Sequence, residues 1–171
     1  MITVTKICFL IPQETVLLER ERSPGTMSED DLLWCFGGNV DFVDAQSQQS
    51  RVAIDVPLLG FAGDLAMLAR QLRTDGNYEV PDKYGGYVLT FIAKGGHVSV
   101  HSEGNVGVKN APPKADPVFV SEAGQLFSAM GNFAYSVMGE LLALFPELGA
   151  NLEFHRLCND IRGRFLSNPS A

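Results

Sequence analysis

The chain has 171 residues, of which 46% are hydrophobic and 19% charged. This balance excludes an intrinsically disordered chain, and the length suffices for one domain with a sizeable core. No apolar run approaches the roughly 18 residues of a membrane span, and the run Ile7–Ile11 is short for a secretory signal. Cys8, Cys35 and Cys158 are odd in number and widely scattered, which indicates reduced thiols rather than a disulfide framework or a zinc site. We therefore expect a cytoplasmic protein without a metal or cofactor.

The formal net charge of −7 is unevenly distributed. Between residues 29 and 82, ten acidic residues face only three basic ones, so this segment alone carries the whole excess. An acidic surface repels nucleic acids and anionic membranes and attracts basic proteins. An acidic pI also aids solubility without any partner, and the charge by itself leaves both interpretations open.

The N-terminal third shows mainly β-type patterns. Apolar and β-branched residues predict strands over residues 3–11, 15–20, 32–43 and 51–56. The charged, turn-rich residues 19–31 predict a loop, and residues 44–50 a polar connector. The pair Gly37-Gly38 predicts a turn or a bulge inside the third strand.

A helical pattern follows directly. Its apolar residues recur at spacings of three and four and form one face: Leu58, Phe61, Leu65, Leu68 and Leu72. We expect a helix over residues 58–73, with Asp55 as its N-cap and Pro57 near its first turn. Tyr78–Val80 is expected to form a short strand.

The clearest local signal is a hairpin over residues 86–103. Gly95-Gly96 can adopt the positive φ angles of a two-residue turn. Pairing Lys94 with His97 sets the register, and five apolar residues then share one face: Leu89, Phe91, Ala93, Val98 and Val100. Residues 106–108 are expected to add a third strand.

The C-terminal part changes character after a proline-rich linker, residues 110–117. Ser121 is the expected N-cap of a long, largely buried helix that Pro146 ends, and a second amphipathic helix covers residues 148–166. We predict an α+β fold in a single domain over residues 1–171. Residues 1–109 form its sheet-rich portion, and residues 118–166 form a helical pair. The sheet is antiparallel or mixed with five to seven strands, one helix follows the fourth strand, and the C-terminal helical pair packs on the sheet.

Residues 16–41 resemble the front of a Nudix hydrolase. The matching residues are Val16, Leu17, Leu18, Trp34, Phe36, Gly37, Gly38, Val40 and Asp41. The resemblance implies a metal-binding helix at Val52–Pro57, where Asp55 is the only carboxylate. One carboxylate does not supply the several oxygen ligands that a Mg²⁺–diphosphate assembly needs. We predict no catalytic residue and keep a degenerate Nudix-like hydrolase as an alternative.

Residues 51–103 run strand, helix, strand and hairpin. This order, with the junction Ile54-Asp55-Val56-Pro57-Leu58-Leu59, resembles small acidic immunity proteins that protect bacteria against contact-dependent or Rhs-type toxins. The resemblance implies a non-catalytic protein that neutralises a cognate toxin by binding it.

Complementary charge and a few aromatic or acidic anchors hold such complexes. We expect the anchors among Asp30, Asp31, Trp34, Asp41, Asp44, Asp75, Glu79 and Asp82. A second alternative is a homo-oligomeric structural or adaptor protein that dimerises through its apolar C-terminal helices.

Overall fold

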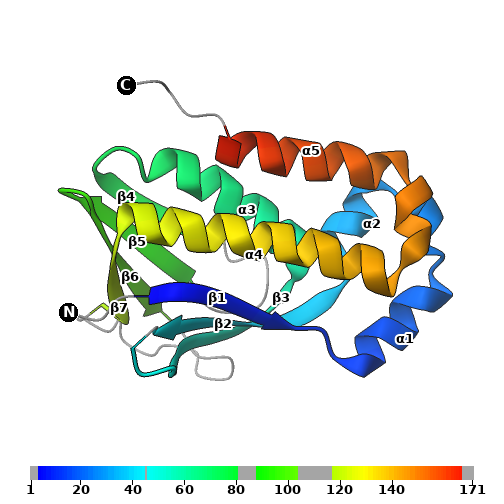
Figure 1. Cartoon of the computed structure of the whole chain (residues 1–171), viewed down its shortest axis with the longest axis horizontal. Coiled ribbons are helices and arrows are strands. Elements are labelled where there is room, and N and C mark those ends of the chain that lie inside the picture. Colours follow the sequence, from blue (N-terminus) through cyan, green and yellow to red (C-terminus); the bar gives the residue numbers. More distant parts are fainter. Residues whose placement is uncertain (1–3, 45, 81–87, 104–116, 167–171) are drawn as a thin grey trace.

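The computed structural model describes residues 4–44, 46–80, 88–103 and 117–166. It is an α+β fold with two antiparallel sheets and five α-helices among these residues (Figure 1). The first sheet has the order β1-β2-β3, with β1 at Val4–Leu10, β2 at Gly37–Asp44 and β3 at Ser50–Pro57. The second has the order β4-β5-β6-β7, with β4 at Gly76–Val80, β5 at Val88–Lys94, β6 at His97–Glu103 and β7 at Phe119–Glu122. The α+β class is confirmed, but the expectation of a single sheet is wrong.

Helices occupy much of the segment for which strands and loops were expected. The α-helices are α1 (Gln13–Glu21), α2 (Glu29–Trp34), α3 (Leu58–Gln71), α4 (Ala123–Leu144) and α5 (Leu152–Leu166), and the 3₁₀ turns are η1 (Pro24–Thr26) and η2 (Pro146–Ala150). The predicted strand over residues 15–20 is therefore helix α1. The predicted loop ends in α2, and strand β2 begins only at Gly37.

The hairpin prediction is confirmed in detail. Lys94 pairs with His97 and Phe91 with Val100, as the alternation requires. Gly95 and Gly96 have φ angles of 58° and 79°, which supply the left-handed turn. The five apolar residues predicted to share one face of the hairpin are all buried.

Two predicted helix caps are wrong. Ser121 lies inside β7 and is buried, because the chain pairs with β6 for four residues before α4 begins. Asp55 lies in β3 and accepts a hydrogen bond from Asn39 on the neighbouring strand, while Pro57 directly precedes α3. The predicted strand over residues 106–108 and nearly all of the linker lie outside the described residues.

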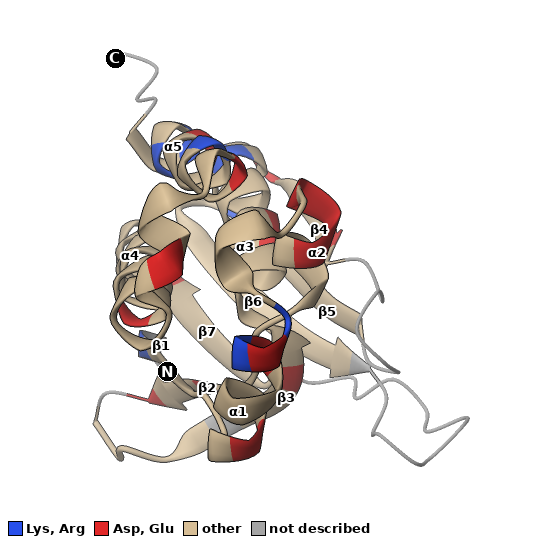
Figure 2. Ribbon diagram, turned by 90° about the vertical axis from the view of Figure 1, so that its right-hand side faces the viewer, with Lys and Arg blue, Asp and Glu red and all other residues tan. Residues whose placement is uncertain are grey.

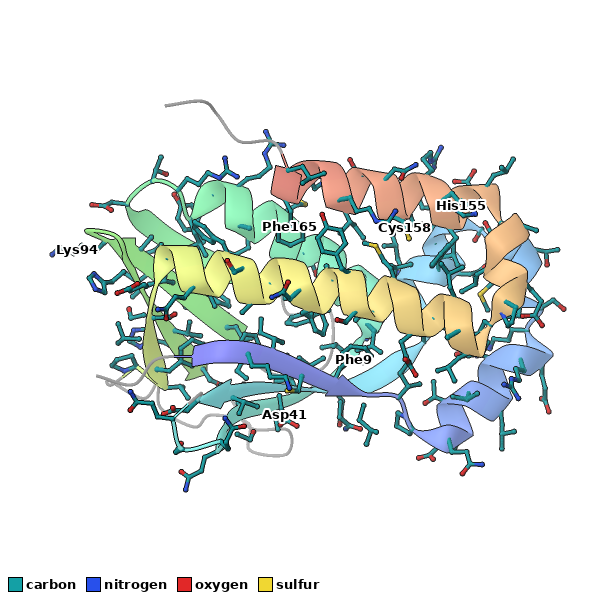
Figure 3. All side chains as sticks on the ribbon, in the orientation of Figure 1. Phe9, Asp41, Lys94, His155, Cys158 and Phe165 are labelled. Atoms are coloured by element: carbon teal, nitrogen blue, oxygen red, sulfur yellow. The ribbon has the colours of Figure 1, made fainter. Side chains whose placement is uncertain are left out.

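The core lies between the sheets and the helices α3 and α4. Its centre is a chain of aromatic contacts in which Phe61 of α3 meets Phe42 of β2 and Phe133 of α4 edge to face, with ring centroids 6.5 and 5.9 Å apart. Figure 3 shows Phe9 between β1 and α4, where its ring lies 5.7 Å from that of Phe133. Of the C-terminal helical pair, α4 packs on β1, whereas α5 packs mainly on α3 and α4 (Figure 1).

Candidate functional site

The structure separates the predicted anchor residues into three regions. Asp30, Asp31 and Trp34 lie on α2, Asp41 and Asp44 on β2, and Asp75 and Glu79 at or next to β4. Helix α2 and strand β4 lie at opposite ends of the molecule (Figure 1). Asp82 lies outside the described residues. The anchors therefore do not form one surface.

The acidic first turn of α2 begins with a reciprocal cap. The Ser28 hydroxyl and backbone amide donate to Asp31 Oδ2 at 2.7 and 3.2 Å, and the Asp31 amide donates to Ser28 Oγ at 3.2 Å. These hydrogen bonds hold the pKa of Asp31 below its ordinary value. Asp31 thus starts the helix, while Asp30 and Trp34 are exposed.

The β2 carboxylates are engaged in local structure. Asp44 is buried and accepts hydrogen bonds from the amides of Gln46 and Ser47, which close the turn after the strand. Asp41 accepts a hydrogen bond of 2.8 Å from the Ser50 hydroxyl of β3. Figure 3 shows Asp41 on the face of the sheet away from α4.

The acids near β4 belong to the edge of the second sheet. Asp75 Oδ1 accepts a hydrogen bond of 3.1 Å from the Gly95 amide, so it ties the segment before β4 to the hairpin turn. Glu79 is exposed and pairs with Thr90 across the ladder. Neither residue lines a described hollow together with the α2 residues.

A groove of about 240 Å³ lies between α2, α3 and α5, and we call it the α2–α3–α5 groove. Its lining from α3 is Gly60, Gly63, Asp64 and Met67, and its other lining residues are Glu29, Leu33, Trp34, Leu157, Asp160, Ile161 and Arg164. The two glycines have no side chains, so α3 contributes mainly backbone to this wall of the groove. Trp34 lines the groove from α2 and has 55% of its surface exposed. Met67 is also half exposed.

The charges around this groove are mainly negative. Its lining contains three carboxylates, from Glu29, Asp64 and Asp160, and one guanidinium, from Arg164. Arg164 Nε donates to Asp160 Oδ2 at 2.8 Å. Figure 2 shows the acidic α2 beside the basic residues of α5, and one of these, Arg156, joins the two helices by an ion pair with Glu29.

Sequence reasoning found Trp34 and the acidity of α2 but missed the rest of the groove. The signal was present: Gly60, Gly63, Asp64 and Met67 recur at helical spacing on a face of α3 beside its buried stripe. Met67 is the only large apolar side chain on this face, so the face has no apolar stripe. Whether it is open depends on where α2 and α5 pack, which the local sequence does not specify.

The segment that corresponds to the catalytic helix of Nudix enzymes has a different structure here. Val52–Pro57 belongs to β3 and pairs with β2. Among the described residues, no group of three or more His, Cys, Asp or Glu side chains could hold a metal ion. The pair Gly37-Gly38 begins strand β2 in regular register with β3, so the predicted turn or bulge at this pair is wrong. Close packing explains the second glycine, Gly38.

The two buried cysteines have weakly acidic thiols. Burial raises the pKa of Cys158 to about 11. Burial also raises the pKa of Cys35, although the Arg22 guanidinium donates to Cys35 Sγ at 3.2 Å and so lowers this pKa in part. Both thiols are therefore protonated at neutral pH and poor nucleophiles.

The raised pKa of Cys158 predicts a pH-dependent stability. Above the pKa of an unfolded thiol the unfolded chain loses its proton first, so the folded state binds more protons and stability falls as pH rises. Between pH 8.5 and 11 this linkage should remove up to about 3 kcal/mol. Urea denaturation across this range should show a shallower loss for Cys158→Ala than for the wild type. Equal slopes would contradict the assignment.

Comparison of the chain with protein-family profiles, with curated proteins and with solved structures gives no match. No helix among the described residues is long and apolar enough to cross a bilayer.

Proposed function

We propose that this chain is a non-catalytic protein-binding module that takes a basic segment of a partner protein into the α2–α3–α5 groove. The observation that carries the proposal is that the exposed Trp34 lines a groove together with two glycines and three carboxylates. Tryptophan in a hollow, with charged groups at its rim, is the arrangement typical of binding hot spots.

The groove favours an arginine or lysine side chain of the partner. An aliphatic stem can lie on Met67 and the face of the Trp34 ring, where a cation gains a further attraction. Its charged head then meets Asp64 and Asp160. The net acidity of the lining selects a basic segment over an acidic one and accelerates the encounter.

The most concrete form of this function is an immunity protein that neutralises a cognate bacterial toxin. Its supports are the carboxylates Glu29 and Asp64, which the acidic segment 29–82 contributes to the groove, and the order β3-α3-β4-β5-β6, which resembles that class. A toxin with a basic substrate-binding surface is a partner of the required charge. Inhibition then needs only occupation of that surface, not chemistry by this chain.

The test is capture of the tagged protein with its partner from its own cells, followed by calorimetry with the purified partner. Trp34→Ala should weaken binding about thirtyfold or more, because it removes the anchor from the middle of the contact. Asp160→Arg should weaken it to a similar degree. Trp34 is the only tryptophan, so its emission reports binding directly.

Glu79→Arg is the matched control, because it makes the same charge change at the other end of the molecule. It should change the affinity by less than about threefold, since exposed charges at a distance are screened by salt. Equal losses of affinity from Asp160→Arg and Glu79→Arg would show that overall charge, and not the groove, determines binding. Failure of the wild type to retain any basic protein would overturn the proposed function.

A further inference from the structure

Helix α1 turns Val16 and one carboxylate toward the core and two leucines toward solvent. Glu19 is its only buried residue, at 4% exposure. Its carboxylate lies 3.7 Å from Arg22 Nε and also approaches the Cys35 thiol. Leu17 and Leu18 instead point outward, with 58% and 50% of their surfaces exposed. An amphipathic helix normally buries its leucines, so this inversion leaves an apolar ridge on the surface.

A groove of about 580 Å³ adjoins this ridge, between α1, the end of β1 and the end of α4. Figure 1 shows these three segments meeting at one end of the molecule. Its apolar lining is Phe9, Leu10, Ile11, Val16, Leu17 and Leu144, and Leu10 is 65% exposed. A contiguous apolar surface of this kind marks an interaction site.

The charges of this α1 groove distinguish its occupant from the basic partner. Its lining contains one cation, Arg20, and one anion, Glu140, whereas the α2–α3–α5 groove is acidic. Arg20 also donates to the Leu144 carbonyl at 3.4 Å, which holds its guanidinium at the end of α4. The two grooves share no lining residue.

We propose that the α1 groove binds a second copy of this chain in a two-fold symmetric dimer. A two-fold axis brings the same patch of both copies together, so a ridge beside a hollow can fill the partner's hollow. The Leu17 ridge of each copy then enters the groove of the other. The axis also sets Arg20 of each copy against Glu140 of the other, so the mixed charges of the groove become complementary.

Sedimentation of the full chain over about 1–100 µM should show a monomer–dimer equilibrium. Leu17→Glu should raise the dissociation constant at least about tenfold, because it places a carboxylate in the apolar contact. Leu152→Glu is the matched control, since Leu152 is 81% exposed on α5. It should leave the equilibrium unchanged. Circular dichroism should show the same helical content for each variant as for the wild type.

A charge exchange tests the symmetry itself. Arg20→Glu and Glu140→Arg should each weaken the dimer about fivefold or more, and the double variant should return to within about threefold of the wild type. Recovery of the dimer in the double variant would show that the single variants do not weaken it by misfolding. A monomer throughout the range, a dimer that Leu152→Glu and not Leu17→Glu dissociates, or a double variant weaker than either single one would overturn the proposal.

Discussion

Replacing Asn151 by alanine should lower the free energy of unfolding by about 3 kcal/mol or more. Asn151 is buried immediately before α5, and its Nδ2 donates to the carbonyls of Pro24 and Met27, each at 3.0 Å. Its Oδ1 accepts from the Phe154 amide at 3.0 Å and so caps the helix. Alanine removes the cap and leaves two buried carbonyls without their side-chain donor, while the urea midpoint measures the loss.

Two further variants separate the contributions. Asn159→Ala removes an exposed asparagine from the same helix and should change stability by less than about 0.5 kcal/mol. Asn151→Ser keeps an acceptor for the cap and should recover about 1 kcal/mol of the loss. If Asn151→Ala and Asn159→Ala were equally stable, the buried amide would not hold η1 to α5.

This amide also matters for the binding groove. Pro24 begins η1 and Met27 directly follows it, and the chain runs from there through Ser28 into α2, which carries Trp34. The bonds from Asn151 therefore fix where α2 sits relative to α5. Arg156 adds an exposed ion pair to Glu29 across the same junction, but such pairs contribute little to stability.

The hairpin and the three long helices could be predicted from the sequence because their signals are local. Gly95-Gly96 and the alternation around Phe91 specify a turn and a face without reference to the rest of the chain. The stripe of α3 likewise specifies a helix of known length. What these signals do not contain is the pairing between distant strands, so the division into two sheets could not be inferred.

Helix α1 was mistaken for a strand for a related reason. The run Thr15–Arg20 has a β-branched start and two adjacent leucines, and its helical form buries Glu19 and not the leucines. Contacts with Arg22 and Cys35 accommodate that carboxylate. The local sequence pattern does not predict these contacts. Helix α2 begins inside the predicted loop, because a helix of six residues is too short to show a helical period.

Only part of the candidate site could be predicted from the sequence, because the rest depends on how distant helices pack. Trp34 and the acids of α2 could be named from composition, whereas the groove exists because α5 closes over the glycine face of α3. Asp44 shows the opposite error, since its charge suggested a surface anchor and its carboxylate closes a turn. Acidic residues near turns serve the backbone as readily as a partner.

Replacing Gly38 by alanine should destabilise the fold by about 2–4 kcal/mol. An ideal Cβ at Gly38 would lie 2.8 Å from the carbonyl oxygen of Leu10 and 2.8 Å from Leu58 Cδ1. The carbonyl belongs to β1, next to β2 in the sheet, and Leu58 is fully buried at the start of α3. The Leu10 carbonyl is backbone and cannot retreat without moving β1, and the Leu58 side chain is enclosed by the core.

Gly37→Ala is the matched control, because a Cβ at Gly37 meets nothing within 4 Å. It should change the free energy of unfolding by less than about 0.5 kcal/mol, with urea denaturation as the measurement for both variants. A large difference between the two variants would assign the second glycine of the pair in the Nudix resemblance to close packing of β1, β2 and α3. Equal effects would mean that the core yields at this point, and that packing does not explain why glycine occupies position 38.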